Sequence, residues 1–302
     1  MYDIIVVGGG PAGMTAALYA QRNGKSALVI EKSGFGGQIT HSPKVENLPG
    51  ELSISGTEFA DKMFSQIMEQ GADIEIETVC AIENKGKTKL VKTEEGGEYE
   101  CYAVILATGV KHRMLGLEGE NELVGEGISF CAVCDGDFYK DKEVCVAGGG
   151  NSALQEAILL SDKCKKVTML QDLPYFTGEE NLQKVLFARD NVEALTGVKI
   201  TKLISDGNDF KGVEIEKDGK LGEVSCDGLF VAIGLIPENE PFRDIAELND
   251  YGYFASDEQC LTKTDGIYVA GDCRSKSTRQ VTTAAADGTV AALEACRYIN
   301  NL

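Results

Sequence analysis

Two cysteines separated by two residues are the part of this sequence best suited to covalent chemistry. The stretch CAVCDG begins at Cys131, and Cys134 is followed directly by Asp135. A C-x-x-C pair can close a small disulfide ring that opens and closes reversibly. The same spacing also forms half of a zinc site. Because there is no second C-x-x-C, and both histidines lie far away in the sequence, we expect a redox dithiol and no bound metal.

A strand, a glycine-rich turn and a helix are predicted at the start of the chain. The segment DIIVVGGGPAGMTAALYAQRNGKSALVIEK contains Gly8, Gly10 and Gly13 and a second apolar strand that ends at Glu31. Glycines at this spacing allow a tight turn, a close approach of phosphate, and contact between helix and sheet. Glu31 lies 21 residues after Gly10, where a carboxylate accepts hydrogen bonds from a ribose. The segment predicts a site for an adenine dinucleotide.

A second copy of this pattern follows the cysteine pair. The segment KEVCVAGGGNSALQEAILLSDKCKKVTMLQD has the turn Gly148-x-Gly150-x-x-Ala153. At the position that corresponds to Glu31 it has Gln171, and Asp172 comes next. We therefore expect a Rossmann-like unit with a degenerate nicotinamide site.

Composition limits the class of protein. The chain has 302 residues, of which 43% are hydrophobic and 25% charged, so it can form two domains that each bury a core. A net charge of −19 argues against nucleic acid or an anionic membrane as a partner. The N-terminal run MYDIIVVGGG is too short for a signal peptide or a membrane span. Ten cysteines are too few for a disulfide scaffold of this length, so we expect a cytoplasmic protein.

The motifs, in their order over nearly the whole chain, resemble the low-molecular-weight, bacterial-type thioredoxin reductases. Besides the first glycine turn and CAVCDG, the similar segments are GGQIT (36–40), ENLPG (46–50), ILATG (105–109), GIYVAGD (266–272) and RQVTTAAADG (279–288). The resemblance implies a dithiol that takes electrons from FAD and passes them to thioredoxin. It makes Cys134 the partner of the flavin, Cys131 the attacker of the substrate, and Asp135 the acid that protonates the leaving thiolate.

The resemblance also implies which residues hold FAD. Asp272 is expected at the ribityl chain, and the N terminus of the last helix is expected to point at the isoalloxazine, where it stabilises negative charge on the reduced flavin. The complete expected set is Gly8, Gly10, Pro11, Ala12, Gly13, Glu31, Lys32, Gly37, Gln38, Asn47, Thr108, Gly109, Gly271, Asp272, Arg279, Gln280 and Val281.

The expected fold is α/β, with two three-layer Rossmann-like nucleotide-binding domains, the second inserted into the first. We expect the FAD domain at 1–112 and 243–302, and the domain that carries the dithiol at 113–242. The resemblance further implies a homodimer.

The electron donor is the point at which the sequence departs from the family. Members that use NADPH have His-Arg-Arg and a further Arg after the second strand of the nucleotide domain, whereas this chain has Gln171, Asp172 and Leu173 and no arginine before Arg189. Each charge-assisted hydrogen bond to phosphate contributes roughly 1.5–3 kcal/mol, and Asp172 would repel a phosphate. We expect reduced ferredoxin to be the donor, as in the ferredoxin-dependent flavin thioredoxin reductases.

Other functions stay open from the sequence alone. NADH could donate electrons, since Asp172 could bind an unphosphorylated ribose. A small-molecule dithiol oxidase of this fold would pass electrons from substrate to flavin and on to oxygen. A flavin-binding sensor without enzyme activity is a further alternative. The intact CAVCD argues against it, because such a sensor would not need a reactive dithiol with an acid beside it. A basic face for an acidic ferredoxin would have to come from residues such as Lys111, Arg113, Lys163, Lys165 and Lys166.

Overall fold

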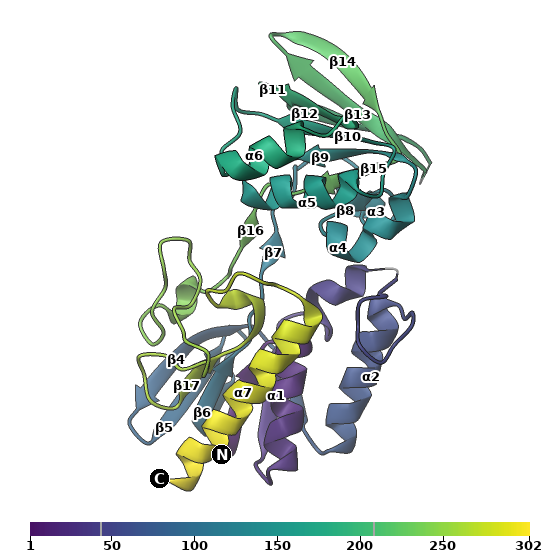
Figure 1. Ribbon diagram of the computed structural model, residues 1–302. Helices are drawn as coiled ribbons and strands as arrows, with labels where there is room; N and C mark the ends of the chain where they lie inside the picture. The colour runs from purple at the N-terminus through teal and green to yellow at the C-terminus, as the bar shows by residue number, and fades with distance from the viewer. Residues whose placement is uncertain (43, 208) are drawn as a thin grey trace. The chain divides into compact units, whose positions relative to one another are not determined.

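The chain forms two compact units. The computed structural model describes residues 1–42, 44–207 and 209–302. The first unit comprises Met1–Lys111 and Ile236–Leu302, and the second comprises His112–Leu235 (Figure 1). In the described part of the chain, no helix is long and apolar enough to cross a membrane.

The first unit is built on a seven-stranded sheet with the order β3-β2-β1-β6-β5-β4, in which β17 also pairs with β6. The pairs β1–β2, β1–β6, β2–β3 and β17–β6 are parallel, and β4 and β5 form an antiparallel extension. The strands are β1 (Tyr2–Val7), β2 (Ala27–Glu31), β3 (Asp73–Ile76), β4 (Val79–Lys85), β5 (Thr88–Thr93), β6 (Glu98–Leu106) and β17 (Ile267–Val269).

Strand β1 shows why this sheet is buried on both faces. Successive side chains of a strand point to opposite faces. Ile4 and Val6 accordingly join one hydrophobic core, whereas Ile5 and Val7 join another. An apolar run of this kind is typical of a central strand in a parallel sheet that is covered on both sides.

Three helices of the first unit contribute to the core that contains Ile4 and Val6. They are α1 (Pro11–Arg22), α2 (Gly56–Glu69) and α7 (Val281–Asn300), and α1 and α7 lie side by side (Figure 1). At their crossing, a Cβ on Gly288 would lie 2.2 Å from the carbonyl oxygen of Ala12, so only glycine permits this approach. The contact fixes the first turn of α1 against the last helix of the chain. The 3₁₀ helices of this unit are η1 (Gly37–His41), η3 (Glu240–Phe242) and η4 (Gly271–Cys273).

The second unit also has three layers. Its parallel sheet has the order β11-β10-β9-β15-β8, and an antiparallel sheet has the order β12-β13-β14. Val144 and Val146 of β9 face a core shared with α5 and α6, while Cys145 and Ala147 face a core shared with β12 and β13. The strands are β8 (Ile128–Ser129), β9 (Glu143–Ala147), β10 (Lys166–Gln171), β11 (Val192–Thr196), β12 (Lys199–Asp206), β13 (Asp209–Lys217), β14 (Lys220–Ser225) and β15 (Gly228–Val231).

Two helices of the second unit adjoin its motifs: Cys134 lies in α4, and α5 begins directly after Gly150 of the second glycine turn. The helices of this unit are α3 (Glu120–Leu123), α4 (Ala132–Asp135), α5 (Asn151–Ser161), α6 (Glu180–Phe187) and the 3₁₀ helix η2 (Gly136–Tyr139). The chain passes between the units twice, through β7 (Lys111–His112) and β16 (Leu235–Ile236), which pair with each other. The predicted α/β fold with two Rossmann-like domains is confirmed.

Candidate functional site

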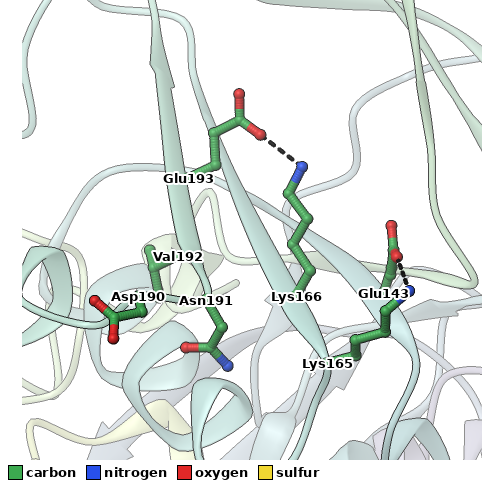
Figure 2. Close-up of a pocket in the computed structure, with 7 residues that line it drawn as sticks. All are labelled: Glu143, Lys165, Lys166, Asp190, Asn191, Val192 and Glu193. Atoms are coloured by element: carbon green, nitrogen blue, oxygen red, sulfur yellow. Dashed lines mark hydrogen bonds and ion pairs between the residues drawn. The ribbon is translucent and has the colours of Figure 1, made fainter.

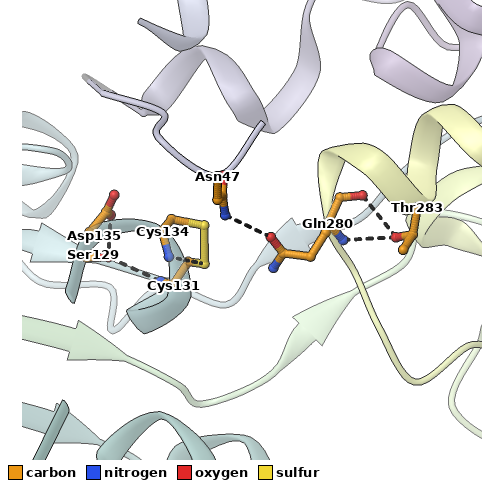
Figure 3. Close-up of a disulfide and its surroundings, with 7 residues drawn as sticks. All are labelled: Asn47, Ser129, Cys131, Cys134, Asp135, Gln280 and Thr283. Carbon is orange, nitrogen blue, oxygen red and sulfur yellow. Dashed lines mark hydrogen bonds between the residues drawn. A yellow bond between two sulfur atoms is a disulfide. The ribbon is translucent and has the colours of Figure 1, made fainter. Parts of the chain in front are cut away.

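The cysteine pair is a disulfide at the start of a short helix. Cys131 precedes α4 and Cys134 lies within it, with Cα atoms 5.3 Å apart (Figure 3). The backbone N–H of Cys134 donates to Sγ of Cys131 over 3.2 Å. Both cysteines are half-buried, whereas the other eight are free and all but the exposed Cys80 are buried. The accessible redox chemistry of this chain is therefore concentrated in one pair.

Asp135 is tied to the cysteine pair by a serine. The hydroxyl of Ser129 donates to Oδ2 of Asp135 over 2.6 Å and accepts from the backbone N–H of Cys131 over 3.1 Å (Figure 3). Burial raises the pKa of Asp135, and the Ser129 hydrogen bond partly opposes this effect. The other oxygen of Asp135, Oδ1, is buried and has no hydrogen-bond partner among the described residues. Burial thus favours a protonated carboxyl that is linked through Ser129 to the backbone of Cys131.

Ser129 could not be identified as a site residue from the sequence. Its signal in the sequence is weak, because it is a single serine at the end of β8, two residues before Cys131. The side chain of Ser129 is only 4% exposed, so its hydroxyl forms hydrogen bonds inside this unit and not with solvent.

The first glycine turn leaves open space in front of α1. A Cβ on Gly8 would lie 2.3 Å from the carbonyl oxygen of Ala107, and one on Gly13 would lie 1.9 Å from that of Gly8. At Gly10 no atom lies within 4 Å of the Cβ position, and no side chain caps the helix there. Gly8 and Gly13 are thus required for packing, whereas Gly10 keeps clear a cradle at a helix N terminus, where phosphate binds well.

The carboxylate of Glu31 lies beside this cradle. Its Oε2 accepts from the backbone N–H of Gly9 over 2.6 Å, and its Oε1 accepts from that of Ser33 over 3.0 Å. Glu31 ends β2 and is buried, so the side chain is fixed where a ribose would meet it. Lys32, the next residue, forms an ion pair with Glu238.

Asp272 has the buried, unpartnered oxygen that a polyol hydroxyl could satisfy. It lies in η4, and its Oδ1 has no hydrogen-bond partner in the described structure, although Nζ of Lys276 is 3.5 Å away. Burial raises the pKa of Asp272, while Lys276 and Arg279 act in the opposite direction. The open cradle at Gly10, the fixed carboxylate of Glu31 and this oxygen together fit an adenine dinucleotide with a ribityl chain.

A buried ion cluster holds the turn that carries Asp272. Asp287 of α7 accepts from the backbone N–H of Gly271 over 3.0 Å and from Nη2 of Arg274 over 2.7 Å. Nζ of Lys276 lies 3.0 Å from Oδ2 of Asp287, the oxygen that also accepts from Gly271. These three charged residues could not be identified from the sequence, because they act on the turn from positions that only the fold brings together.

The remaining residues expected at FAD all belong to the first unit. Asn47 donates to Oε1 of Gln280 over 3.2 Å, and the backbone N–H of Gln280 donates to Thr283 over 3.1 Å at the start of α7 (Figure 3). The guanidinium of Arg279 lies 4.3 Å from the ring centre of Tyr253. The others lie at the start of a helix or after a strand: Pro11, Ala12, Gly37, Gln38, Thr108, Gly109 and Val281.

The loop after β10 packs against the second glycine turn at Gly149, as Phe35 does against Gly9 in the first turn. Gly150, the counterpart of Gly10, has only Oγ1 of Thr177 near its Cβ position, at 3.8 Å. A Cβ on Gly149 would lie 2.5 Å from Cδ of Gln171, the counterpart of Glu31. The side-chain amide of Gln171 donates to the backbone carbonyl of Tyr175 over 3.2 Å. The backbone N–H groups of Thr177 and Gly178 both donate to the backbone carbonyl of Gly149 over 2.9 Å. The side chain that would be an acid in a ribose site is here a neutral amide that holds the loop.

A surface hollow of about 520 Å³ lies at the other end of the same sheet, where β9, β10 and β11 begin. Both lysines of the hollow are paired, Lys165 with Glu143 over 2.6 Å and Lys166 with Glu193 over 2.7 Å (Figure 2). Its lining residues are Glu143, Lys165, Lys166, Asp190, Asn191, Val192 and Glu193. Paired charges of this kind leave little net field for an anionic ligand.

Most of the basic residues that could form a docking face for an acidic ferredoxin are also paired with carboxylates. Lys111 pairs with Glu238 over 3.0 Å and Lys163 with Asp137 over 2.7 Å, in addition to the two lysines of the hollow. Four of the five residues are therefore locally neutralised.

Comparison with known proteins agrees with this geometry. The profile of the pyridine nucleotide-disulphide oxidoreductase family matches residues 2–288. A thioredoxin reductase of Listeria monocytogenes is 38% identical over 100% of this chain and 95% of its own length. A "34.2 kDa protein in rubredoxin operon" of Clostridium pasteurianum is 39% identical over 98% of this chain and 97% of its own.

A solved structure shows the same likeness. The crystal structure of thioredoxin reductase from Streptococcus pyogenes superposes with a TM-score of 0.95 at 37% identity, and the match covers 100% of this chain and 99% of that one. Since family profile, sequence and fold agree over the full length, the chain belongs to the low-molecular-weight thioredoxin reductases, a group of flavin-dependent disulfide oxidoreductases within the pyridine nucleotide-disulphide oxidoreductase family.

Proposed function

We propose that this protein uses FAD to reduce thioredoxin through Cys131 and Cys134, with electrons from reduced ferredoxin rather than NADPH. The observation that carries the reductase activity is the half-buried disulfide with Ser129 and Asp135 beside it. Thioredoxin is the proposed acceptor because relatives that match over the full length are named thioredoxin reductases. A homodimer is proposed from the same likeness.

FAD, held by the first unit, would supply the electron pair that opens the disulfide. Gly10 clears the space for the pyrophosphate, Glu31 accepts hydrogen bonds from the ribose, and Asp272 accepts from the ribityl chain. The N terminus of α7 at Val281 provides positive partial charge. The remaining residues expected at FAD complete the proposed site.

The residues of the dithiol have distinct proposed roles. Cys134 is the partner of the flavin and Cys131 attacks the substrate disulfide. Asp135 protonates the leaving thiolate, and burial favours this role because it raises the pKa of Asp135 and so stabilises the protonated form. Ser129 orients the Asp135 carboxyl towards the backbone of Cys131.

The donor proposal rests on the loop that follows β10. From Gln171 to Gln183 the chain has no lysine or arginine, and Asp172, Glu179 and Glu180 are acidic. A 2′-phosphate would find no charge-assisted hydrogen bond from a side chain of this segment and would meet repulsion instead. NADPH is for this reason disfavoured. NADH is the second candidate, because Asp172 is positioned just beyond Gln171 and could accept from an unphosphorylated ribose.

Ferredoxin is a sufficiently strong reductant. Taking roughly −400 mV for a low-potential ferredoxin and about −270 mV for thioredoxin, the transfer of two electrons releases about 6 kcal/mol. Because Lys111, Lys163, Lys165 and Lys166 are paired with acidic residues, we propose that ferredoxin docks through other groups or displaces these partners.

Anaerobic reduction of the purified yellow protein tests the proposal. NADPH, NADH and photoreduced ferredoxin are added separately, and the flavin absorbance is followed with and without thioredoxin. Rapid bleaching by ferredoxin alone, with thiols appearing on thioredoxin, is the expected result. Rapid bleaching by NADH or NADPH would contradict the donor proposal. Reduction by a small dithiol with transfer to oxygen, and none to thioredoxin, would favour a dithiol oxidase.

A further inference from the structure

Two carboxyl groups in the second unit each have a buried oxygen without a hydrogen-bond partner among the described residues. These atoms are Oδ1 of Asp135, at the end of α4, and Oε2 of Glu156, in the middle of α5. Helices α4 and α5 pack against each other. A Cβ on Gly136, directly after α4, would lie 3.4 Å from Leu160, which is one helical turn after Glu156 on the same face of α5. Glu156 therefore faces the region of Asp135.

The surroundings favour the protonated form of Glu156. Burial, and after it the charge of Asp135, raises the pKa of Glu156 to about 8. Two carboxyls that interact in a buried site resist ionising together, so such a pair retains one proton over a wide pH range.

Cations on the elements packed against α5 are engaged elsewhere. Lys163 after α5 pairs with Asp137 of η2, Lys166 of β10 with Glu193, and Lys184 of α6 with Glu180. The neutral groups in this region are the phenol of Tyr139 on η2, whose pKa burial and Asp135 raise to about 12, and the buried thiol of Cys164 after α5, whose pKa burial raises to about 11. Burial and Asp135 are the two causes of the raised pKa of Glu156.

We propose that Glu156 is a positioning residue that keeps a proton on the Asp135–Glu156 carboxyl pair at neutral pH and returns it to Asp135 during thiol–disulfide exchange. This inference rests on the proposed role of Asp135 as the acid, but not on the identity of the electron donor or of the substrate disulfide.

The exchange balances as follows. The Cys131 thiol loses its proton to solvent, and its sulfur attacks the substrate disulfide, which breaks. Glu156 transfers the single proton of the pair to Asp135, and the leaving thiolate takes this proton from Asp135. Cys134 next attacks the mixed disulfide and returns its own proton to the pair, while the second substrate thiolate takes one from solvent. Two electrons and a net two protons pass to the substrate, and the Cys131–Cys134 bond is formed again.

Infrared difference spectroscopy of the full-length oxidised protein tests where the proton resides. We expect a protonated carboxyl band that persists through neutral pH and disappears near pH 8. The band should be absent at neutral pH in Glu156→Gln and present in Glu223→Gln, a matched control at an exposed position of β14. Absence of the band from the unmodified protein overturns the proposal, whether or not the variant folds. So does a band that survives in Glu156→Gln.

A kinetic measurement separates proton delivery from a merely structural role. The protein is reduced with dithionite, desalted without oxygen, and mixed with 5,5′-dithiobis(2-nitrobenzoate), so neither ferredoxin nor thioredoxin takes part. In Glu156→Gln the decrease of the exchange rate at alkaline pH should begin about one pH unit lower than in the unmodified protein. At acidic pH the two proteins should react at similar rates. Glu223→Gln should follow the unmodified protein. An equal loss at every pH, or an unmoved alkaline fall, overturns the proposal. A failed donor or acceptor assignment would leave these results unchanged.

Discussion

The hydroxyl of Ser129 donates to the carboxyl of Asp135 over 2.6 Å while its oxygen accepts from the backbone N–H of Cys131 over 3.1 Å. One side chain thus connects the proposed acid to the backbone of the proposed nucleophile. The hydrogen bond also lowers the pKa of Asp135, which burial raises.

Ser129→Ala should therefore raise the pKa of Asp135 further and move the alkaline fall of dithiol exchange to higher pH. It should also lower the free energy of unfolding by about 1–3 kcal/mol, because buried polar groups lose their partner. The pH profile of exchange and denaturant unfolding measure the two effects. Ser225→Ala, at an exposed position of β14, is the control. An alkaline fall that moves to lower pH would contradict the role given to Ser129.

Cys134→Ser should abolish disulfide reduction and leave the flavin bound, because the proposed FAD site lies in the first unit and Cys134 in the second. Turnover with thioredoxin and the flavin absorbance of the purified variant report the two properties. Cys80→Ser changes an exposed free cysteine of the first unit and should leave turnover unaltered. A Cys134→Ser protein that still turns over would refute the dithiol mechanism.

Gly10 and Gly13 should respond to alanine in different ways. Gly13→Ala places a Cβ 1.9 Å from the carbonyl of Gly8 and should prevent stable folding of the turn. Gly10→Ala meets no atom within 4 Å, and Gly10 has φ of −77°, so the protein should fold. Its added methyl group would enter the space proposed for the pyrophosphate and should weaken FAD binding. Thermal unfolding of the apoprotein and flavin titration separate the outcomes. Full FAD affinity in Gly10→Ala would show that the cradle does not hold phosphate.

The double substitution Leu173→Arg with Tyr175→Arg should not create efficient use of NADPH. Both side chains are exposed, at 40% and 61%, so arginine fits at each position. Asp172 remains acidic, however, and Gln171 still holds the loop through the carbonyl of residue 175. Bleaching rates with NADPH measure the effect, with Leu173→Gln/Tyr175→Gln as the uncharged control. Full NADPH activity in the arginine variant would show that charge at these two positions alone decides the donor.

Much of the fold could be predicted because its signals are local. The glycine turns, the apolar run of β1 and the acid at Glu31 each occupy a continuous stretch, and their duplication predicts two Rossmann-like units. Cys131, Cys134 and Asp135 are likewise contiguous, so spacing and resemblance sufficed.

The interactions that could not be predicted join residues through the fold. Asp287 lies on α7 and reaches Gly271 and Arg274 only because the last helix packs beside η4. Asp135 and Glu156 come into the same region only because α4 packs on α5. The pairing of Lys165 and Lys166 depends on which carboxylates the neighbouring strand ends present, and no sequence pattern specifies that.

The free energy of unfolding should depend on pH because Glu156 is protonated in the folded protein. Its pKa of about 8 in the folded protein lies above the ordinary value of 4.5. Between these pH values the folded protein binds the proton more tightly than the unfolded chain does, so the free energy of unfolding falls as pH rises. The loss is on the order of a few kcal/mol and should level off above pH 8. In Glu156→Gln this component should vanish, so that denaturant unfolding becomes less dependent on pH across the same window, whereas Glu223→Gln should keep the slope. A slope that is equal in Glu156→Gln and the unmodified protein would mean that Glu156 is ionised in the folded state, and the carboxyl pair would then hold no proton for the dithiol.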